Sequence, residues 1–362
     1  MSCARLLRLA PDGTRSNPCW VVAGASKLGD VFVSLSLVSQ TPGPLAAAVA
    51  VDAGSGVNAA LALAGRLGLS RPVPGDGSTR DLWEAFATLG ADDLGMVRAV
   101  EPHLDAVGIL AQARMEPGDG TWGVFAAEGG DDPLTASPGD AVTLSGTKAW
   151  CSLADRLDSA LVTATTSTGH KQLFAVDMGH PGVRVAPAMW MARGLSEIPS
   201  GPVSFSVVPA IPVGGPGWYL ERPGFAFGGI GVAACWFGGA VGIARTVHAA
   251  AAAGPNPFLL AHLGAIDDLL QSCRRALLEA AQLVGYPSTD GRLLAKRVRA
   301  RVAKSCEEII ERAGHALGPA PLALDEVHAK RIADLQLYIR QHHAERDDES
   351  LGRAIAEGPA PW

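Results

Sequence analysis

The sequence of 362 residues has few charged residues and contains no C-x-x-C motif. Charged residues make up 18% of it and the formal net charge is −6, so we expect neither a nucleic acid nor a membrane surface as a partner. The six cysteines, none of which lies in a C-x-x-C pair, are Cys3, Cys19, Cys151, Cys235, Cys273 and Cys306. This spacing favours neither a zinc site nor a disulfide framework, and reduced thiols in a cytoplasmic protein are the simpler interpretation.

Long apolar runs and targeting segments are also missing. No window reaches the ~18 uninterrupted apolar residues of a membrane span, and the closest, residues 224–244, is rich in glycine. Arg5 and Arg8 are not followed by an uninterrupted apolar core, so we expect no signal peptide. Residues 20–29 look like a nucleotide-binding loop after a strand, but the pattern G-x-x-x-x-G-K-S/T is broken after Gly29.

Periodicity divides the rest of the chain into helices, strands and helices again. Apolar residues at helical spacing predict helices over residues 45–69, 81–89 and 92–113, the first of them interrupted at Gly54-Ser55-Gly56. Short valine-rich segments between Gly, Pro, Asp and Ser turns predict strands between residues 116 and 213. Four helical segments come next, at residues 225–247, 257–284, 290–316 and 324–355. The first of these is apolar all round, which predicts a buried central helix whose glycines permit close helix approach.

Residues 143–152 form the most informative stretch, with the sequence T-L-S-G-T-K-A-W-C-S. It predicts a strand, a tight turn at Ser145-Gly146, and a second strand that carries Trp150 and Ser152. This pair suits a planar aromatic ligand, because an indole can lie against a ring system while a hydroxyl or backbone N–H contacts its polar edge. A half-buried tryptophan in an ordinary hairpin is the alternative that these residues leave open.

Together with the strand that comes next in the chain, this stretch resembles the middle β-domain of the acyl-CoA dehydrogenase family. Lys148, Trp150 and Ser152 match the family's G-x-K-x-W-I-S/T hairpin, and residues 161–164 match the strand after it. The order of helices and strands is similar over nearly the whole chain from Thr79 onward. The resemblance implies an α+β fold, with an N-terminal helical domain over residues 1–115, a middle β-barrel or sandwich domain over residues 116–215, and a C-terminal four-helix bundle over residues 216–362.

The same resemblance implies a flavoprotein with FAD as its cofactor. It places the flavin against Trp150, Cys151 and Ser152. The loop that begins with Phe125 and Ala127 takes the place of the family's T-E-P-x-A-G-S-D loop, which lies over the flavin. Backbone N–H groups of such a glycine loop can meet flavin oxygens. A plain solvent loop is the alternative that its residues leave open.

The family's catalytic glutamate is not found in this sequence. The family places it either on the long first helix of the bundle or near the turn of the C-terminal helices. Residues 222–266 contain no Asp or Glu, and the second position falls on His342, with Glu345 as the nearby acid. The resemblance therefore names His342 and Glu345 as the catalytic candidates. A histidine here is similar to the monooxygenase branch of the superfamily, in which reduced flavin reacts with oxygen without a glutamate base; a polar helix end is the other interpretation.

Four further features bear on ligands. The family's R-x-Q-F-G motif, whose arginine binds the FAD pyrophosphate of a partner subunit, is absent from residues 249–257.

Residues 101–106 are similar to the family's E-x-H-x-D-A helix, and we interpret His103 there as a packing residue. The adjacent His342 and His343 cannot place both rings on one ion along a helix face, so we expect no metal. A solvated helix face, or a contact with cofactor phosphates, explains the basic run Arg292, Lys296, Arg297, Arg299, Arg301 and Lys304.

Three functions stay open on these grounds. The first is an FAD-dependent oxidoreductase of the acyl-CoA dehydrogenase type, acting on an acyl thioester or a related small molecule. The second is a flavin-dependent monooxygenase on the same scaffold. The third is a catalytically silent scaffold protein that binds a paralogous subunit. The resemblance also implies homodimers or homotetramers built on the C-terminal bundle.

Overall fold

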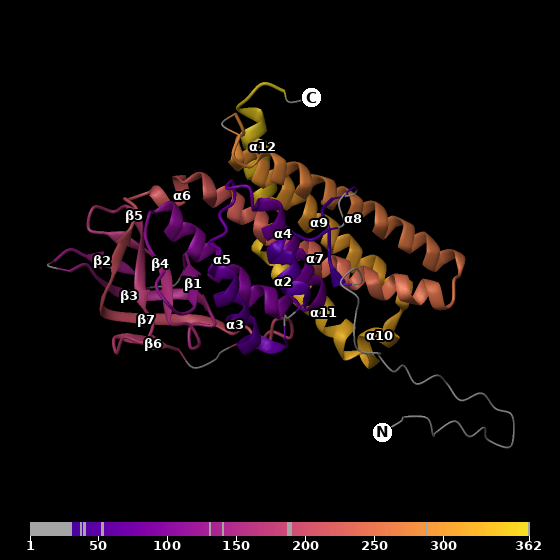
Figure 1. The fold of residues 1–362 in the computed structure, drawn as a ribbon, viewed down its shortest axis with the longest axis horizontal. Helices are drawn as coiled ribbons and strands as arrows, with labels where there is room; N and C mark the ends of the chain where they lie inside the picture. The colour runs from indigo at the N-terminus through magenta and orange to yellow at the C-terminus, as the bar shows by residue number, and fades with distance from the viewer. Residues whose placement is uncertain are drawn as a thin grey trace, which may run out of the picture.

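The computed structural model describes residues 31–360, apart from residues 37, 39–40, 52–53, 130–131, 140, 187–189 and 287. Helices, a sheet and a second set of helices succeed one another along the chain, as the sequence predicts (Figure 1). The sheet forms one end of the molecule, and the long helices of the C-terminal half form the other (Figure 1). The loop at residues 20–29 and the N-terminal segment judged for a signal peptide lie outside the described residues.

The described helices before the sheet are α2 (Pro44–Val51), α3 (Gly56–Gly68), α4 (Thr79–Asp92) and α5 (Leu94–Gln112). Gly54 and Gly56 both have positive φ, which accounts for the predicted break between α2 and α3. Asp93 caps α5, since its carboxylate accepts the N–H of Gly95 at 2.7 Å and that of Met96 at 3.4 Å. Most of α5 is buried, and it touches both the sheet and the bundle.

The described strands are β1 (Trp122–Phe125), β2 (Thr135–Ser137), β3 (Thr143–Ser152), β4 (Ser159–Thr166), β5 (Lys171–Asp177), β6 (Val183–Val185), β7 (Ser200–Pro209) and β8 (Ile211–Val213). They form one mixed sheet in the order β6-β7-β3-β2-β4-β5-β8, with β1 parallel to β4. Phe125 and Phe174 belong to the core enclosed by one face of the sheet. Leu161 and Leu173 belong to a second core with Leu110 of α5, so the other face packs against this helix.

The turn predicted at Ser145-Gly146 is wrong, because β3 runs unbroken through these residues. Gly146 has φ +118°, and the register of β3 against β7 shifts around it, so the glycine forms a bulge. A Cβ at this position would lie 2.7 Å from the Pro133 carbonyl oxygen, which leaves room for glycine alone. Trp150 and Ser152 therefore lie near the end of one long strand.

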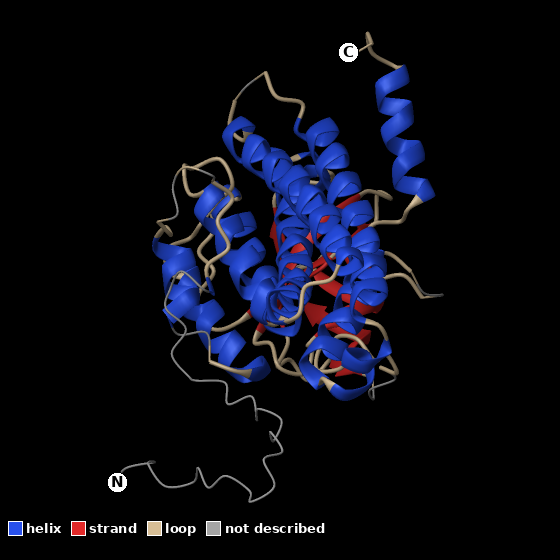
Figure 2. Cartoon of the chain, turned by 90° about the vertical axis from the view of Figure 1, so that its right-hand side faces the viewer, coloured by secondary structure: helices blue, strands red, loops and turns tan. Residues whose placement is uncertain are grey.

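The described helices after the sheet are α6 (Trp218–Glu221), α7 (Pro223–Ala253), α8 (Pro257–Leu283), α9 (Gly291–Leu317), α10 (Pro319–Leu324), α11 (Glu326–Tyr338), the 3₁₀ turn η1 (Ile339–Gln341) and α12 (Glu345–Ala356). The single helix predicted over residues 324–355 is wrong. The chain leaves the helical path between η1 and α12, where His342 is extended and Ala344 has φ +42°. Figure 2 shows α12 at the edge of the helical bundle, where it contacts α9.

Helix α7 lies at the centre of the bundle and is largely buried, as its all-round apolar sequence predicts. It packs against α4 and α9. A Cβ on Gly238 would clash with the backbone of Ala87 in α4, so this glycine permits the close approach of the two helices. Among the described residues, α7 is the one helix long and apolar enough to cross a membrane, but 72% of its most apolar stretch is buried inside the protein, as in a core helix.

Candidate functional site

A cavity of about 630 Å³ lies between α5, α7 and α9, with residues of α12 at its edge. This volume is in the range of about 300–1,000 Å³ that is typical of small-molecule sites. Its apolar wall comes from α6 and the first turns of α7 and includes Leu220, Phe225 and Val232. Its polar wall consists of Glu101, Asp105, Arg222, Arg292, Lys296, Arg299, His342, Asp347 and Ser350.

Two carboxyl groups one turn apart on α5 line the cavity. Asp105 Oδ1 lies 3.7 Å from Arg222 Nη2 and forms an ion pair with it. Glu101 is 8% exposed, and its carboxyl group makes no hydrogen bond or ion pair within the described part of the chain. Burial, followed by the charge of Asp105, raises the pKa of Glu101 to about 7. With a pKa in this range, a carboxyl group can hold or release a proton near neutral pH.

Two arginines line the cavity and join the elements around it. Arg222, which precedes α7, donates a hydrogen bond of 2.7 Å to Gln112 Oε1 at the end of α5. Arg299 of α9 donates bonds of 2.8 Å to the Gly229 carbonyl and 3.0 Å to the Gln341 carbonyl. The second arginine thus joins α9, α7 and the chain segment before α12 around the cavity.

His342, predicted as catalytic, is 6% exposed and lines the cavity. Its backbone N–H donates to the Ile339 carbonyl at 2.9 Å, which fixes it directly after η1. Its Nε2 lies 4.0 Å from Asp347 Oδ2. Burial lowers the pKa of the imidazole from its ordinary value; the charge of Asp347 opposes this shift and that of Arg299 adds to it, and the net shift favours the neutral ring.

Glu345, the second predicted catalytic residue, begins α12 and is exposed to solvent. It is not among the residues that line the cavity, whereas Asp347 of the same helix is. The extended backbone at His342 turns the chain before α12 begins, and this change of direction separates the two predicted residues. The structure therefore brings His342 to the cavity and leaves Glu345 outside it.

The residues predicted to bind the cofactor do not line this cavity. Trp150 is 59% exposed near the end of β3. Ser152 Oγ accepts a hydrogen bond of 2.9 Å from Arg98 Nη2 and lies 2.6 Å from Ser200 Oγ of β7. Arg98 precedes Glu101 by three residues on α5, so a single helix turn connects this face of β3 with the cavity.

The other three residues predicted to bind the cofactor, Phe125, Ala127 and Cys151, differ in whether their side chains are exposed to solvent. The side chains of Phe125 and Cys151 are buried in the sheet core, and burial raises the pKa of the Cys151 thiol to about 12. Ala127 is exposed in the loop after β1. This loop passes beside the indole, since a Cβ on Gly129 would lie 3.9 Å from Trp150 Nε1. The structure thus brings the loop and Trp150 together, and Phe125 and Cys151 can offer only backbone groups.

Lys148, the remaining residue of the matched motif, anchors this loop. Its side chain is 3% exposed, and its Nζ lies 2.9 Å from Glu128 Oε1. Lys171 of β5 pairs with the other oxygen of Glu128 at 2.8 Å. Two lysines therefore hold the loop after β1 in place next to β3.

The acids on α5 are functional candidates that the sequence pattern did not single out. The sequence could have indicated them, because Glu101 and Asp105 are four residues apart and share one face of a largely apolar helix. The residues of the basic run on α9 have different surroundings. Three of them, Arg292, Lys296 and Arg299, line the cavity, where a ligand could contact them. Lys304 instead pairs with Asp348 of α12 at 2.7 Å.

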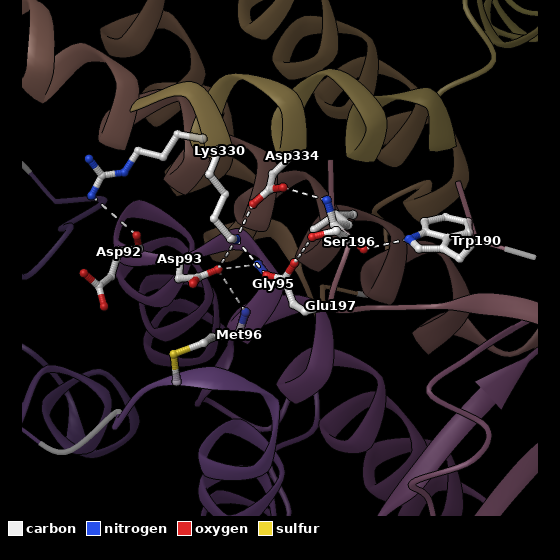
Figure 3. A network of polar contacts seen from close by, with 11 residues as sticks. Asp92, Asp93, Gly95, Met96, Trp190, Ser196, Glu197, Lys330 and Asp334 are labelled. Carbon is white, nitrogen blue, oxygen red and sulfur yellow. Dashed lines mark hydrogen bonds and ion pairs between the residues drawn. The ribbon is translucent and has the colours of Figure 1, made fainter. Parts of the chain in front are cut away.

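A second polar cluster lies outside the cavity and surrounds Lys330 of α11 (Figure 3). Its Nζ lies 2.6 Å from Asp334 Oδ2, 2.7 Å from Glu197 Oε1 and 2.9 Å from Asp93 Oδ1. The three carboxylates have the spacing of metal ligands, but the ammonium group already pairs with all of them. The cluster ties the start of α5 and the loop before β7 to α11, and we interpret it as structural.

Comparison with known proteins identifies similar structures. No protein-family model and no curated protein matches the chain. Butyryl-CoA dehydrogenase from Megasphaera elsdenii aligns with a TM-score of 0.73 and 16% identity, over 83% of this chain and 90% of its own. KijD3 in complex with FMN and a dTDP-linked amino-keto sugar aligns with a TM-score of 0.69 and 19% identity, over 84% and 88%. FMN-bound TdsC from Paenibacillus sp. A11-2, a dibenzothiophene monooxygenase, aligns with a TM-score of 0.68 and 18% identity, over 88% and 92%.

Proposed function

We propose that this chain, which has the acyl-CoA dehydrogenase fold, is a flavin-dependent oxidoreductase that acts on a small molecule in the cavity. The position of α5 carries this proposal. Arg98 of this helix bonds to Ser152 on β3, and Glu101, one turn further along, faces the cavity. A cofactor on the β3 side and a substrate on the cavity side are held close together, as transfer between them requires.

The face of β3 fits a flavin ring. The exposed indole of Trp150 offers a flat apolar surface, and Ser152 and Arg98 offer hydrogen bonds to the polar edge of a ring. The gap enclosed between Arg98, Phe125 and Ser152 measures only about 10 Å³, so the open face beside Trp150 is the surface that can take a ring. A bound flavin would supply a two-electron acceptor, while the side chains of this chain would hold it and handle the proton.

The resemblance implies FAD, whereas the similar structures of KijD3 and TdsC contain FMN. Residues 249–257 supply no arginine for a pyrophosphate. Each missing charge-assisted hydrogen bond removes ~1.5–3 kcal/mol of binding free energy, so the adenylate half of FAD gains little here. We therefore expect the Kd values for FAD and FMN to differ by no more than about tenfold.

An acyl thioester or a related small molecule is the substrate that we propose first. Leu220, Phe225 and Val232 give the cavity a wall that suits an acyl chain. Arg292 is exposed and Lys296 is half-buried on the same turns of α9, where they suit the phosphate groups of coenzyme A.

A flavin-dependent monooxygenase is the second candidate, and His342 is the observation that favours it. The chain has an imidazole and no carboxylate directly after η1. Because this buried ring is neutral, it can donate or accept a hydrogen bond without placing a charge beside the substrate.

An absorbance spectrum of the purified protein, with titration by FAD and FMN, tests the shared part of both candidates. We expect flavin bands in the near ultraviolet and blue. Anaerobic bleaching of the bound flavin by butyryl-CoA supports the dehydrogenase. Oxygen consumption by the reduced flavin, without such bleaching, supports the monooxygenase. A colourless protein that takes up neither flavin in excess contradicts both and leaves the scaffold function.

We also propose that the chain forms a homodimer or homotetramer through its C-terminal helices. Phe258 of α8 and Leu324 of α10 are 81% and 86% exposed, and exposed apolar side chains on a bundle support a partner surface. Light scattering during size-exclusion chromatography measures the mass of the assembly directly. A single species at the chain mass of 37.3 kDa contradicts this proposal.

A further inference from the structure

The geometry points to Glu101 as the residue that removes a proton from the carbon next to a thioester carbonyl when such a ligand lies in the cavity. The choice of ligand rests on the proposed function. The residue itself lies on α5, away from both positions at which sequence resemblance led us to look for a glutamate.

Glu101 differs from the other acids of the cavity in having no partner. Asp105 pairs with Arg222, and the backbone N–H of His343 donates to Asp347 at 3.0 Å. The Glu101 carboxyl has no hydrogen bond or ion pair in the described parts of the chain, although its side chain is more than nine-tenths buried. A buried polar group without a partner costs free energy, so a ligand group in the cavity is its natural partner.

The surroundings of Glu101 keep its proton exchangeable. The titratable and charged groups that face it are Arg98 and Asp105 of α5, Tyr219 of α6, Cys235 of α7, Arg299 of α9 and Tyr338 of α11. Burial and Asp105 raise its pKa to about 7, while the two arginines limit the rise. A general base works best when its pKa is near the working pH, and Glu101 meets this condition.

The rest of the cavity orients such a ligand. The apolar wall of Phe225 and Val232 takes the acyl chain, and Lys296, held by the Ser350 carbonyl at 3.1 Å, stands at the edge with Arg292. Glu101 lines the same cavity as both groups, so its carboxyl can contact a ligand whose acyl chain and charged carrier they hold. In an acyl thioester, the carbonyl and its neighbouring carbon join these two parts.

The proposed step is a proton transfer that needs no oxidant. The C–H bond next to the carbonyl breaks, an O–H bond forms on Glu101, and the electron pair stays on the ligand as an enolate. Return of the proton restores the thioester. In deuterated water the returning hydrogen is deuterium, so the step leaves a label on the ligand even without flavin.

Incubation of butyryl-CoA with the purified protein in deuterated water, and then mass spectrometry of the thioester, measures this step. We expect deuterium at the carbon next to the carbonyl, and an exchange rate at least about 100-fold lower in Glu101→Gln. Glu84→Gln is the control, because Glu84 of α4 is also a buried glutamate but lies outside the cavity lining. The proposal is overturned if the wild-type protein gives no exchange or if Glu101→Gln exchanges at the wild-type rate.

Two further measurements separate this inference from folding and from the flavin proposal. The wild-type exchange rate should rise with pH and reach half its maximum near pH 7, and a profile flat from pH 5 to 8 counts against Glu101. Glu101→Asp keeps a carboxyl and should retain part of the exchange even if Glu101→Gln does not fold; complete loss in a folded Glu101→Asp protein also counts against the step. Exchange by a protein that binds no flavin would refute the oxidoreductase proposal and leave Glu101 supported. Flavin binding without exchange would support the oxidoreductase proposal and refute the role of Glu101.

Discussion

Arg98 Nη2 lies 2.9 Å from Ser152 Oγ, and this bond joins helix α5 to strand β3 across 54 residues of sequence. The same guanidinium lies 5.7 Å from the ring centroid of Tyr338 on α11. Arg98 thus contacts the sheet and the bundle at once, and its partner Ser152 lies two residues after the exposed Trp150 on β3. A cation in this position affects whatever binds to the face of β3.

Replacing Arg98 by Met should weaken flavin binding about tenfold. The change removes one charge-assisted hydrogen bond donor beside Ser152 but keeps most of the apolar stem. Quenching of flavin fluorescence during titration gives the Kd. Arg156→Met, at an exposed position of the same sheet region, should bind flavin like the wild type. Equal Kd values for the two variants would rule out a contact between Arg98 and the cofactor.

Replacing Trp150 by Ala should sharply reduce the flavin bound, because the ring loses the flat surface on which it stacks. Aromatic pairs contribute about 0.5–1.5 kcal/mol beyond their buried area, and the indole adds its own area to that. Trp150→Phe keeps a smaller aromatic surface and should lose less. The ratio of flavin to protein absorbance measures occupancy. Unchanged occupancy in Trp150→Ala would refute the placement of the cofactor against Trp150.

The fold could be predicted from the sequence because its signals are local. The all-round apolar run of α7, the valine-rich strands and the Lys148 motif each lie within a short window. Periodicity does not predict the break between α11 and α12, because polar residues continue through it at a spacing that a helix also allows. The extended backbone of His342 and the positive φ of Ala344 end the helical path there, and neither residue type carries a sequence signal for its conformation.

The cavity could not be predicted in the same way, since its walls come together only in the folded chain. Glu101 faces Arg299 and Tyr338, which lie about two hundred residues further along the sequence. Only tertiary packing shows that this glutamate is buried and unpaired. His342, a candidate through the family resemblance, does line the cavity, whereas its role in catalysis stays a prediction.

Replacing Lys330 by Met should lower the free energy of unfolding by about 2 kcal/mol. The change leaves Asp93, Glu197 and the buried Asp334 without their shared cation. Removing one partner of a fully buried ion pair costs about 3–5 kcal/mol, and the smaller value applies because Lys330 is 35% exposed.

Urea unfolding of Lys330→Met beside Lys304→Met provides the comparison. Lys304 pairs with Asp348 at the surface, with both side chains more than a third exposed, so its loss should cost less than about 1 kcal/mol. Similar losses in the two variants would show that the Lys330 cluster does not hold the three segments together.

The buried, neutral His103 should make the free energy of unfolding fall in mild acid. It is 3% exposed, and its Nδ1 accepts the Trp122 N–H at 3.1 Å. Burial lowers its pKa from 6.5 to about 4, so between these values the unfolded chain binds a proton that the folded chain does not. This contribution to stability is present above pH 6.5 and is lost as the pH falls toward 4, amounting to about 2 kcal/mol between pH 7 and pH 5.

The variant His103→Gln keeps an acceptor and removes the titration. Its unfolding free energy should fall by about 2 kcal/mol less than that of the wild type between pH 7 and pH 5. His170→Gln, at an exposed histidine, should track the wild-type curve. Parallel curves for His103→Gln and the wild type would mean that His103 titrates normally and is not a buried packing residue.

Gly238 should be intolerant of a single added methyl group. A Cβ there would come within 3 Å of the Ala87 backbone, and two packed helices cannot move apart cheaply. Gly238→Ala should lower the free energy of unfolding by about 1–3 kcal/mol, although alanine is the better helix former. Gly264→Ala is the matched change in α8, where a Cβ meets nothing within 4 Å, and it should raise stability by about 0.5–1 kcal/mol. A urea midpoint that stays unchanged or rises in Gly238→Ala would show that close packing of α7 on α4 does not depend on this glycine.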